Sequence, residues 1–255
     1  MNKLITILFL LFAFVGNAQR STFHINGYYL SATIPYQAPL IFTNGLVLNL
    51  DAANPASYAG AGNSWNDLSG TNNGTLSNVT FESNPKTFVF NGSSSRISFS
   101  NGITAGDNLT YEAWIYRLAG SGVIANINSW NAGYVHWQFG GNSLQYAINN
   151  NGDNDRVSTF SFNLNTWYQV VVVYSKVNKT TSFYVNGALT NTESYGSASS
   201  ITQNPFTIGA WDTNGAGAYD RFFNGKIAVF RAYNTALNVT QIQQNYNALK
   251  SFFGL

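Results

Sequence analysis

Short apolar runs separated by Asn, Gly, Ser and Asp dominate the chain from Gly45 onward. Most of them recur about every 8–15 residues, a spacing typical of an antiparallel β-sandwich or barrel. No internal repeat of fixed period is visible, which argues against a solenoid or propeller. The sequence therefore predicts an all-β fold with strands at 46–50, 87–90, 96–99, 109–117, 122–127, 134–139, 143–148, 156–162, 167–174, 181–185, 206–208 and 222–233.

A hairpin and a central strand stand out among these runs. Alternate residues of 181–185 share one face, and Asn186-Gly187 follows directly. An Asn-Gly pair favours the tight turn whose twist suits an antiparallel hairpin. The run Trp-Tyr-Gln-Val-Val-Val-Val-Tyr at 167–174 is apolar on both faces, which predicts a central strand covered on both sides.

One helix is predicted, at 239–253, where it would pack on the sandwich and close it. Asn238 precedes this segment and Gln241 follows three residues later, which is the pattern of a capping box. Gly254 is suited to end the helix. The apolar residues of the segment fall on one helical face: Val239, Ile242, Tyr246 and Leu249.

The first 18 residues have the pattern of a cleaved secretory signal. Lys3 is followed by the apolar run Leu4–Val15, and small residues precede Gln19. The alternative is a membrane anchor, but about 20 apolar residues are needed to span a bilayer and this run is shorter. No later run is long and apolar enough to span a membrane. We therefore expect a signal peptide at 1–18, an N-terminal extension at 19–44, and bacterial-type export.

Composition excludes several classes of protein. Only 9% of the chain is charged and the formal net charge is +2, so nothing predicts nucleic-acid binding. A hydrophobic content of 45% excludes a disordered chain. The absence of Cys excludes disulfides and thiolate metal sites, and the two histidines, His24 and His136, leave little scope for histidine chemistry. Aromatic residues and 35 Asn are abundant instead.

Eight segments from Gly45 to the C-terminus have a characteristic order and spacing. They are GLVLNLDAANPASY (45–58), WNDLSGTNNGTL (65–76), LTYEAWIY (109–116), WYQVV (167–171), FYVNG (183–187), FTIG (206–209), FNGKI (223–227) and YNTAL (233–237). Together these segments resemble the laminin-G-like jelly rolls of the concanavalin A-like lectin/glucanase superfamily. The resemblance implies two curved antiparallel sheets with a concave face, over a domain at 45–255. Members of the superfamily bind glycans or proteins, serve as adhesion modules, or cleave polysaccharides.

A catalytic set is not predicted. Glycoside hydrolysis needs two carboxylates that flank the scissile bond. Glucanases of the superfamily carry Glu-x-Asp-x-x-Glu on one strand, and nothing in this chain matches that pattern. Glu112 is the only acid inside a predicted strand, on the face shared with Trp114, and is the one candidate general acid. The alternative is a Glu that pairs with an Arg or lies at a solvated edge, which we favour because no second acid lies on that strand.

Calcium is the one metal that the sequence allows. The segment Asn149–Asp155 is rich in side-chain oxygens, and Asp153 and Asp155 are candidate Ca²⁺ ligands. The alternative is an Asn- and Gly-rich hairpin turn stabilised by local hydrogen bonds. Many relatives hold a structural Ca²⁺ through an Asp of the last strand, but this chain has Ala228 at that position, which argues against the family site.

Two aromatic and polar segments are candidates for ligand binding. Trp130 with Asn131 and Trp211 with Asp212 and Asn214 combine indole rings with hydrogen-bonding side chains. Trp211 follows a predicted strand and begins a Gly- and Asp-rich loop, which favours an exposed ring. The alternative for both indoles is the core, where Trp65, Trp114 and Trp167 are expected.

These observations predict a non-catalytic module, secreted or at the cell surface, that binds carbohydrate or another surface ligand and has a role such as cell adhesion. Two alternatives remain open. The first is a divergent polysaccharide hydrolase or lyase that uses Glu112 with an acid from a loop. The second is a structural module that binds a protein partner, which an exposed apolar patch without a groove would favour.

Overall fold

The computed structural model describes residues 20–25, 28–33, 38–103, 106–149, 155–202 and 204–255. The chain forms two compact units, residues 1–39 and residues 40–255. In the first unit, β1 (Arg20–Ile25) pairs with β2 (Tyr28–Thr33) as an antiparallel hairpin. The second unit begins at Leu40. The segment 1–18, interpreted above as a signal, lies outside the described residues.

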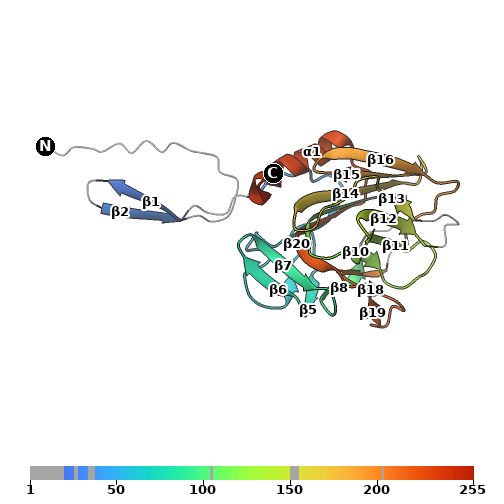
Figure 1. Cartoon of the computed structure of the whole chain (residues 1–255), viewed down its shortest axis with the longest axis horizontal. Coiled ribbons are helices and arrows are strands. Elements are labelled where there is room, and N and C mark those ends of the chain that lie inside the picture. Colours follow the sequence, from blue (N-terminus) through green and yellow to red (C-terminus); the bar gives the residue numbers. More distant parts are fainter. Residues whose placement is uncertain (1–19, 26–27, 34–37, 104–105, 150–154, 203) are drawn as a thin grey trace. The chain divides into compact units, whose positions relative to one another are not determined.

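The second unit consists of two antiparallel sheets packed face to face, as Figure 1 shows. The front sheet runs from edge to edge through β13 (Arg156–Val157), β12 (Ser143–Ile148), β11 (Val135–Gly140), β10 (Gly122–Ile127), β17 (Pro205–Ile208), β8 (Arg96–Gly102), β5 (Gly74–Ser77) and β4 (Ser64–Trp65). The back sheet runs through β16 (Ala188–Ser194), β15 (Thr180–Val185), β14 (Trp167–Ser175), β9 (Asn108–Arg117), β20 (Asn224–Tyr233), β7 (Lys86–Asn91) and β6 (Thr80–Ser83), with β3 (Leu46–Asp51) paired to β20. The predicted two-sheet sandwich is confirmed.

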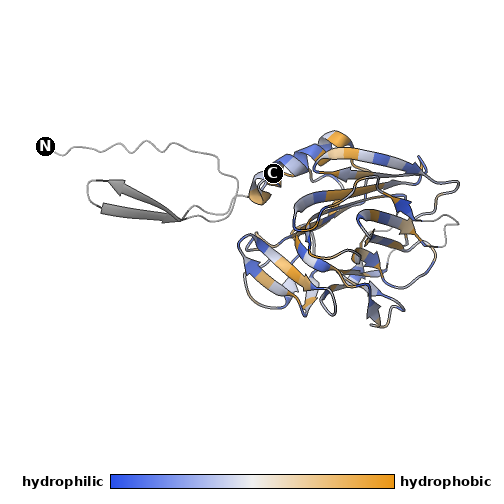
Figure 2. Ribbon diagram, in the orientation of Figure 1, coloured by the Kyte–Doolittle hydropathy of each residue, from blue (hydrophilic) through white to orange (hydrophobic). Residues whose placement is uncertain are grey.

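The core between the sheets is rich in aromatic rings. Hydrophilic and hydrophobic residues follow one another along the strands in Figure 2, and the hydrophobic set faces inward. Phe99 stacks on Phe206 with ring centroids 4.0 Å apart, and Trp65 meets Phe88 edge-on at 4.8 Å. Trp65 is fully buried, as predicted. The sequence contains no Cys, so no disulfide supports the fold, and burial of this core stabilises it instead.

Strand β14 is covered on both faces, which confirms the prediction made from its sequence. Val170 and Val172 belong to the core between the sheets. Val171 and Val173 point the other way and pack in a second cluster with Ile242 of the C-terminal helix. Both faces of the strand are therefore shielded from water, and its apolar run does not leave an exposed hydrophobic face.

The turn between β15 and β16 is the predicted tight hairpin. Asn186 and Gly187 both have a positive φ, at 51° and 77°. Two consecutive left-handed residues define the type I′ turn that Asn-Gly favours. A Cβ atom at Gly187 would lie 3.1 Å from Cδ1 of Tyr246, a tight contact that adds to the strain of a side chain at this positive φ.

Helix α1 (Val239–Leu249) covers the outer face of the back sheet. Its capping box is formed as predicted, with reciprocal hydrogen bonds between Asn238 and Gln241. The α-helix ends at Leu249, and 250–253 form a 3₁₀ turn, so the predicted single helix to residue 253 was too long. The tighter turn packs Phe253 on Trp114, with ring centroids 4.3 Å apart. No helix of the described residues is both long and apolar enough to cross a membrane.

Some strands differ from the prediction. Of the run 156–162, only Arg156 and Val157 pair as a strand, because Phe160 and Phe162 turn into an aromatic cluster around Tyr168. Strands β4, β5, β6 and β16 were not predicted. They are short or lie at sheet edges and carry many Ser, Thr and Asn residues, so their sequences lack a clear hydrophobic alternation.

Candidate functional site

Three aromatic rings meet on the outer face of the front sheet. Val135 and Trp137 of β11 point into the core, so His136 between them points outward. Trp211 begins β18 (Trp211–Asp212), which pairs with β19 (Tyr219–Asp220) and lies against β10. Trp130 comes from the loop between β10 and β11. We call these three residues, Trp130, His136 and Trp211, the aromatic cluster.

Each ring of the aromatic cluster contacts the other two. The centroids of the Trp130 and Trp211 rings are 5.4 Å apart, and those of Trp130 and His136 are 5.2 Å apart, both in stacked orientations. The His136 ring is tilted against Trp211 at 5.0 Å. Trp130 is 48% exposed, whereas Trp211 is 3% and His136 1% exposed. The prediction of an exposed Trp211 is therefore wrong: Trp211 and His136 form a buried base, and Trp130 is the ring that faces solvent.

Polar contacts hold the His136 ring in place. Its Nδ1 lies 2.9 Å from Oδ1 of Asn149, and its Nε2 lies 3.1 Å from Oδ1 of Asp155. The hydrogen bond from His136 lowers the pKa of the Asp155 carboxyl below its usual value. Asp155 is therefore ionised at neutral pH, and its partly exposed side chain places a carboxylate at the border of the cluster.

The guanidinium group of Arg221 lies on the indole ring of Trp211. Arg221 Cζ is 4.5 Å from the centroid of the Trp211 ring, and its Nε is 3.7 Å from Oδ1 of Asp220. Arg221 has φ 48° and Ser129, just before Trp130, has φ 76°. Left-handed backbone is costly for residues other than glycine and is often found at functional sites. Here it fixes the directions of Trp130 and Arg221.

Backbone hydrogen bonds fix both of these left-handed residues. The amide of Ser129 donates to the carbonyl of Asp212 at 2.8 Å, and the amide of Val123 donates to the carbonyl of Arg221 at 2.9 Å. The loop that carries Trp130 is thereby joined to the β18–β19 hairpin that carries Trp211. The site is a pre-formed unit of two loops on a rigid sheet.

Two of the other predicted ligand-binding residues organise turns. Asp212 is buried, and its Oδ1 accepts hydrogen bonds from the amides of Asn214 and Gly215 at 3.3 and 2.8 Å. Asn214 is exposed, and its Oδ1 accepts from the amide of Ala216 at 2.8 Å. Asn131 is exposed beside Trp130. Of this predicted set, Asn131 and Trp130 are therefore the residues best placed to meet a ligand.

The residues present do not fit the calcium site implied by the family. Ala228 is buried in an apolar cluster with Trp114, Val229 and Leu249, so that position has no side-chain oxygen. Asp155 is engaged with His136, and Asp153 lies outside the described residues. In the described part of the chain, no three His, Asp or Glu side chains gather where they could hold a metal ion.

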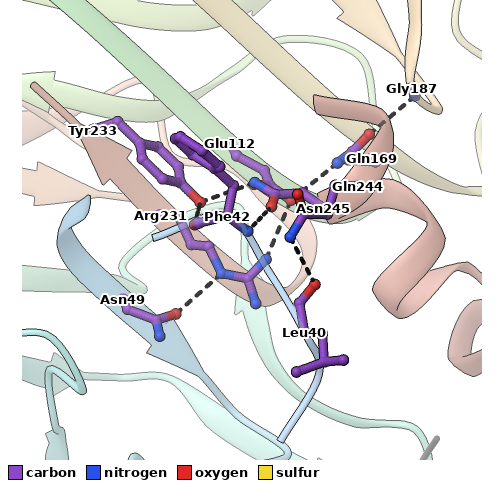
Figure 3. A network of polar contacts seen from close by, with 10 residues as sticks. All are labelled: Leu40, Phe42, Asn49, Glu112, Gln169, Gly187, Arg231, Tyr233, Gln244 and Asn245. Atoms are coloured by element: carbon purple, nitrogen blue, oxygen red, sulfur yellow. Dashed lines mark hydrogen bonds and ion pairs between the residues drawn. The ribbon is translucent and has the colours of Figure 1, made fainter. Parts of the chain in front are cut away.

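Glu112 belongs to β9 of the back sheet and is buried beneath α1 (Figure 3). Its Oε1 accepts from Nη1 of Arg231 at 3.2 Å and from Nε2 of Gln169 at 3.0 Å, and its Oε2 accepts from Nδ2 of Asn245 at 2.6 Å. The pairing with Arg is the alternative that the sequence favoured. At 1% exposure and covered by the helix, Glu112 joins α1 to the sheet and cannot reach a polysaccharide from this position.

Comparisons with known proteins agree with this fold. The sequence profile of a laminin G family, described as the concanavalin A-like lectin/glucanases superfamily, matches residues 91–243, which is more than half of the chain. No curated protein sequence matches the chain significantly.

Solved structures of similar fold include three of different kinds. Domain 4 of AbnA, an extracellular GH43 arabinanase from Geobacillus stearothermophilus, has a TM-score of 0.60 at 16% identity and covers 79% of this chain and 98% of that one. The receptor binding domain of botulinum neurotoxin C/D mosaic serotype has a TM-score of 0.61 at 16% identity, over 80% of this chain and 51% of that one. A heptameric SAP-like pentraxin from Limulus polyphemus has a TM-score of 0.53 at 19% identity, over 61% and 78%. At these identities the likeness shows the fold alone, and this chain spans about half the length of the toxin domain.

Proposed function

The chain belongs to the concanavalin A-like lectin/glucanase superfamily, and from this premise we propose that it is a non-catalytic carbohydrate-binding module whose binding surface is the aromatic cluster. The observation that carries the proposal is the half-exposed Trp130 ring, held flat against His136 and Trp211. A fixed, solvent-facing indole offers the apolar C–H face of a sugar a surface to stack on, without the cost of ordering a mobile side chain.

Polar groups around Trp130 supply the hydrogen bonds that orient a sugar. The carboxylate of Asp155 accepts from hydroxyl groups, the guanidinium of Arg221 donates, and the exposed amide of Asn131 does both. An apolar surface with a few convergent polar groups is the usual composition of a small-ligand site. A structural neighbour, domain 4 of the arabinanase, was solved in complex with arabinotriose, which supports a saccharide as the ligand class.

We also propose that binding takes place outside the cytoplasm. The support is the sequence of residues 1–18, whose short apolar run after a positive charge has the pattern of an export signal. Secreted or surface-exposed saccharides are then the ligands available to the module.

The experiment is a glycan-binding screen of the purified chain, followed by calorimetry on the best ligand. We expect Trp130→Ala to weaken binding at least tenfold and Trp130→Phe to retain part of it, because a smaller ring still stacks. Leu189→Ala, at a similarly exposed residue of the back-sheet edge, is the matched control and should leave binding unchanged. Binding that is unaffected by Trp130→Ala would contradict the proposed site.

A further inference from the structure

We infer that the aromatic cluster selects neutral saccharides and discriminates against polyanionic ones such as uronates and sulfated glycans. This inference rests on the proposed function and adds the chemical class of the ligand. The inference is drawn from the charged side chains around Trp130, two of which are carboxylates, while the guanidinium beside them is paired with one of these carboxylates.

Three charged side chains of the described residues reach solvent at the border of the cluster. Asp155 and Asp220 are carboxylates with side-chain exposures of 32% and 51%, and Arg221, which lies on the Trp211 ring, is a cation with an exposure of 49%. Two negative charges against one positive charge leave no surplus to attract an anion. The His136 ring is buried, and its Nε2 faces the carboxylate of Asp155.

The guanidinium of Arg221 already interacts with groups of the protein itself. Its Nε is 3.7 Å from Oδ1 of Asp220, and its guanidinium lies over the Trp211 ring. Arg221 also acts on Asp155: the hydrogen bond from His136 is the largest cause of the lowered pKa of Asp155, and attraction to Arg221 adds to it. An incoming carboxylate or sulfate would have to compete with both acids for one guanidinium, and would approach two like charges as it did so.

A neutral sugar fits the same groups without this conflict. Its hydroxyls donate to the carboxylates of Asp155 and Asp220 and accept from Arg221, in hydrogen bonds strengthened by the charge on the protein. The ion pairs remain in place while the C–H face of the sugar covers Trp130. Charged residues elsewhere do not reverse this preference for neutral sugars. The whole chain carries a formal net charge of only +2, which gives little long-range steering of anions.

The test compares matched pairs of ligands on the purified chain by calorimetry at low ionic strength. The pairs are methyl-esterified against de-esterified homogalacturonan fragments, and desulfated against sulfated galactan fragments. We expect the neutral member of any pair that binds to bind about fivefold or more tighter than its anionic counterpart. The difference should shrink at high salt, because the repulsion acts between solvent-exposed charges.

Variants separate the charge effect from binding itself. Asp220→Asn should narrow the neutral-to-anionic ratio several-fold, whereas Glu82→Gln, which removes a half-exposed charge at the far edge of the back sheet, should leave it unchanged. Anionic members that bind as tightly as the neutral ones, or a ratio unaffected by Asp220→Asn, would overturn the inference while binding through Trp130 still stood. Failure of every neutral and anionic glycan to bind would overturn both the inference and the proposed function.

Discussion

Replacing Glu112 with glutamine removes one buried charge while keeping the shape of the side chain. In the native structure this carboxylate accepts hydrogen bonds from Arg231, Gln169 and Asn245, and both it and Arg231 are 1% exposed. The substitution leaves the Arg231 cation buried without its counter-ion, a change that costs about 3–5 kcal/mol. The hydrogen bond that joins the sheet to Asn245 of α1 is weakened at the same time.

Thermal unfolding followed by circular dichroism measures this cost. For a domain of this size, about 1 kcal/mol lowers Tm by roughly 2–4 °C, so Glu112→Gln should lower Tm by about 6–20 °C. Glu82→Gln is the matched control, because Glu82 pairs with Lys226 at a partly exposed site where an ion pair contributes at most about 1 kcal/mol. A Glu112→Gln protein that melts within about 2 °C of the native protein would refute the structural role. Loss of a glycanase activity without loss of stability would instead favour the hydrolase alternative.

Three further changes test other parts of the structure. The hydrogen bond from His136 lowers the pKa of Asp155. The stabilisation from this pair is therefore present above the unfolded-state pKa near 3.8 and is lost as the pH falls further. Tryptophan fluorescence should report this loss as an acid transition, and Asp155→Asn should abolish the transition. An acid transition identical in both proteins would contradict that assignment. Gly187→Ala should destabilise the chain by about 1–2 kcal/mol in urea unfolding, because of its positive φ and the contact with Tyr246, and a stabilised variant would show that the turn is misassigned. Asn238→Ala should cost about 1 kcal/mol by loss of the helix cap, and no change would mean that the cap is not formed in solution.

Much of the fold could be predicted because its signals are local. The apolar run of β14 shows that both of its faces are covered, and Asn186-Gly187 specifies the turn that follows β15. The capping box at Asn238 marks the start of α1 in the same way. Edge strands such as β16 escaped prediction because none of the β16 residues is buried, so neither face of the strand is consistently apolar and the alternation that identifies a strand is missing.

Only part of the candidate site could be predicted, because the contacts and exposure of its side chains are determined by the tertiary structure. Trp130 and Trp211 were identified by residue type, but which of them is exposed depends on how the β18–β19 hairpin folds over the front sheet. Asp155 was a candidate calcium ligand by its residue type and its neighbours in sequence, whereas its contact with His136 of β11 depends on the fold. Nothing in the sequence pointed to Arg221, whose place over an indole depends on a left-handed backbone that arginine rarely adopts.

Binding at the aromatic cluster can be observed directly by following the indole N–H resonances of the chain by NMR during titration with a neutral oligosaccharide that binds. We expect a saturable shift of the Trp130 resonance, a smaller shift of Trp211 beneath it, and no shift of the buried residues Trp65 and Trp114. Saturable binding that leaves the Trp130 resonance in place would show that the aromatic cluster is not the binding surface.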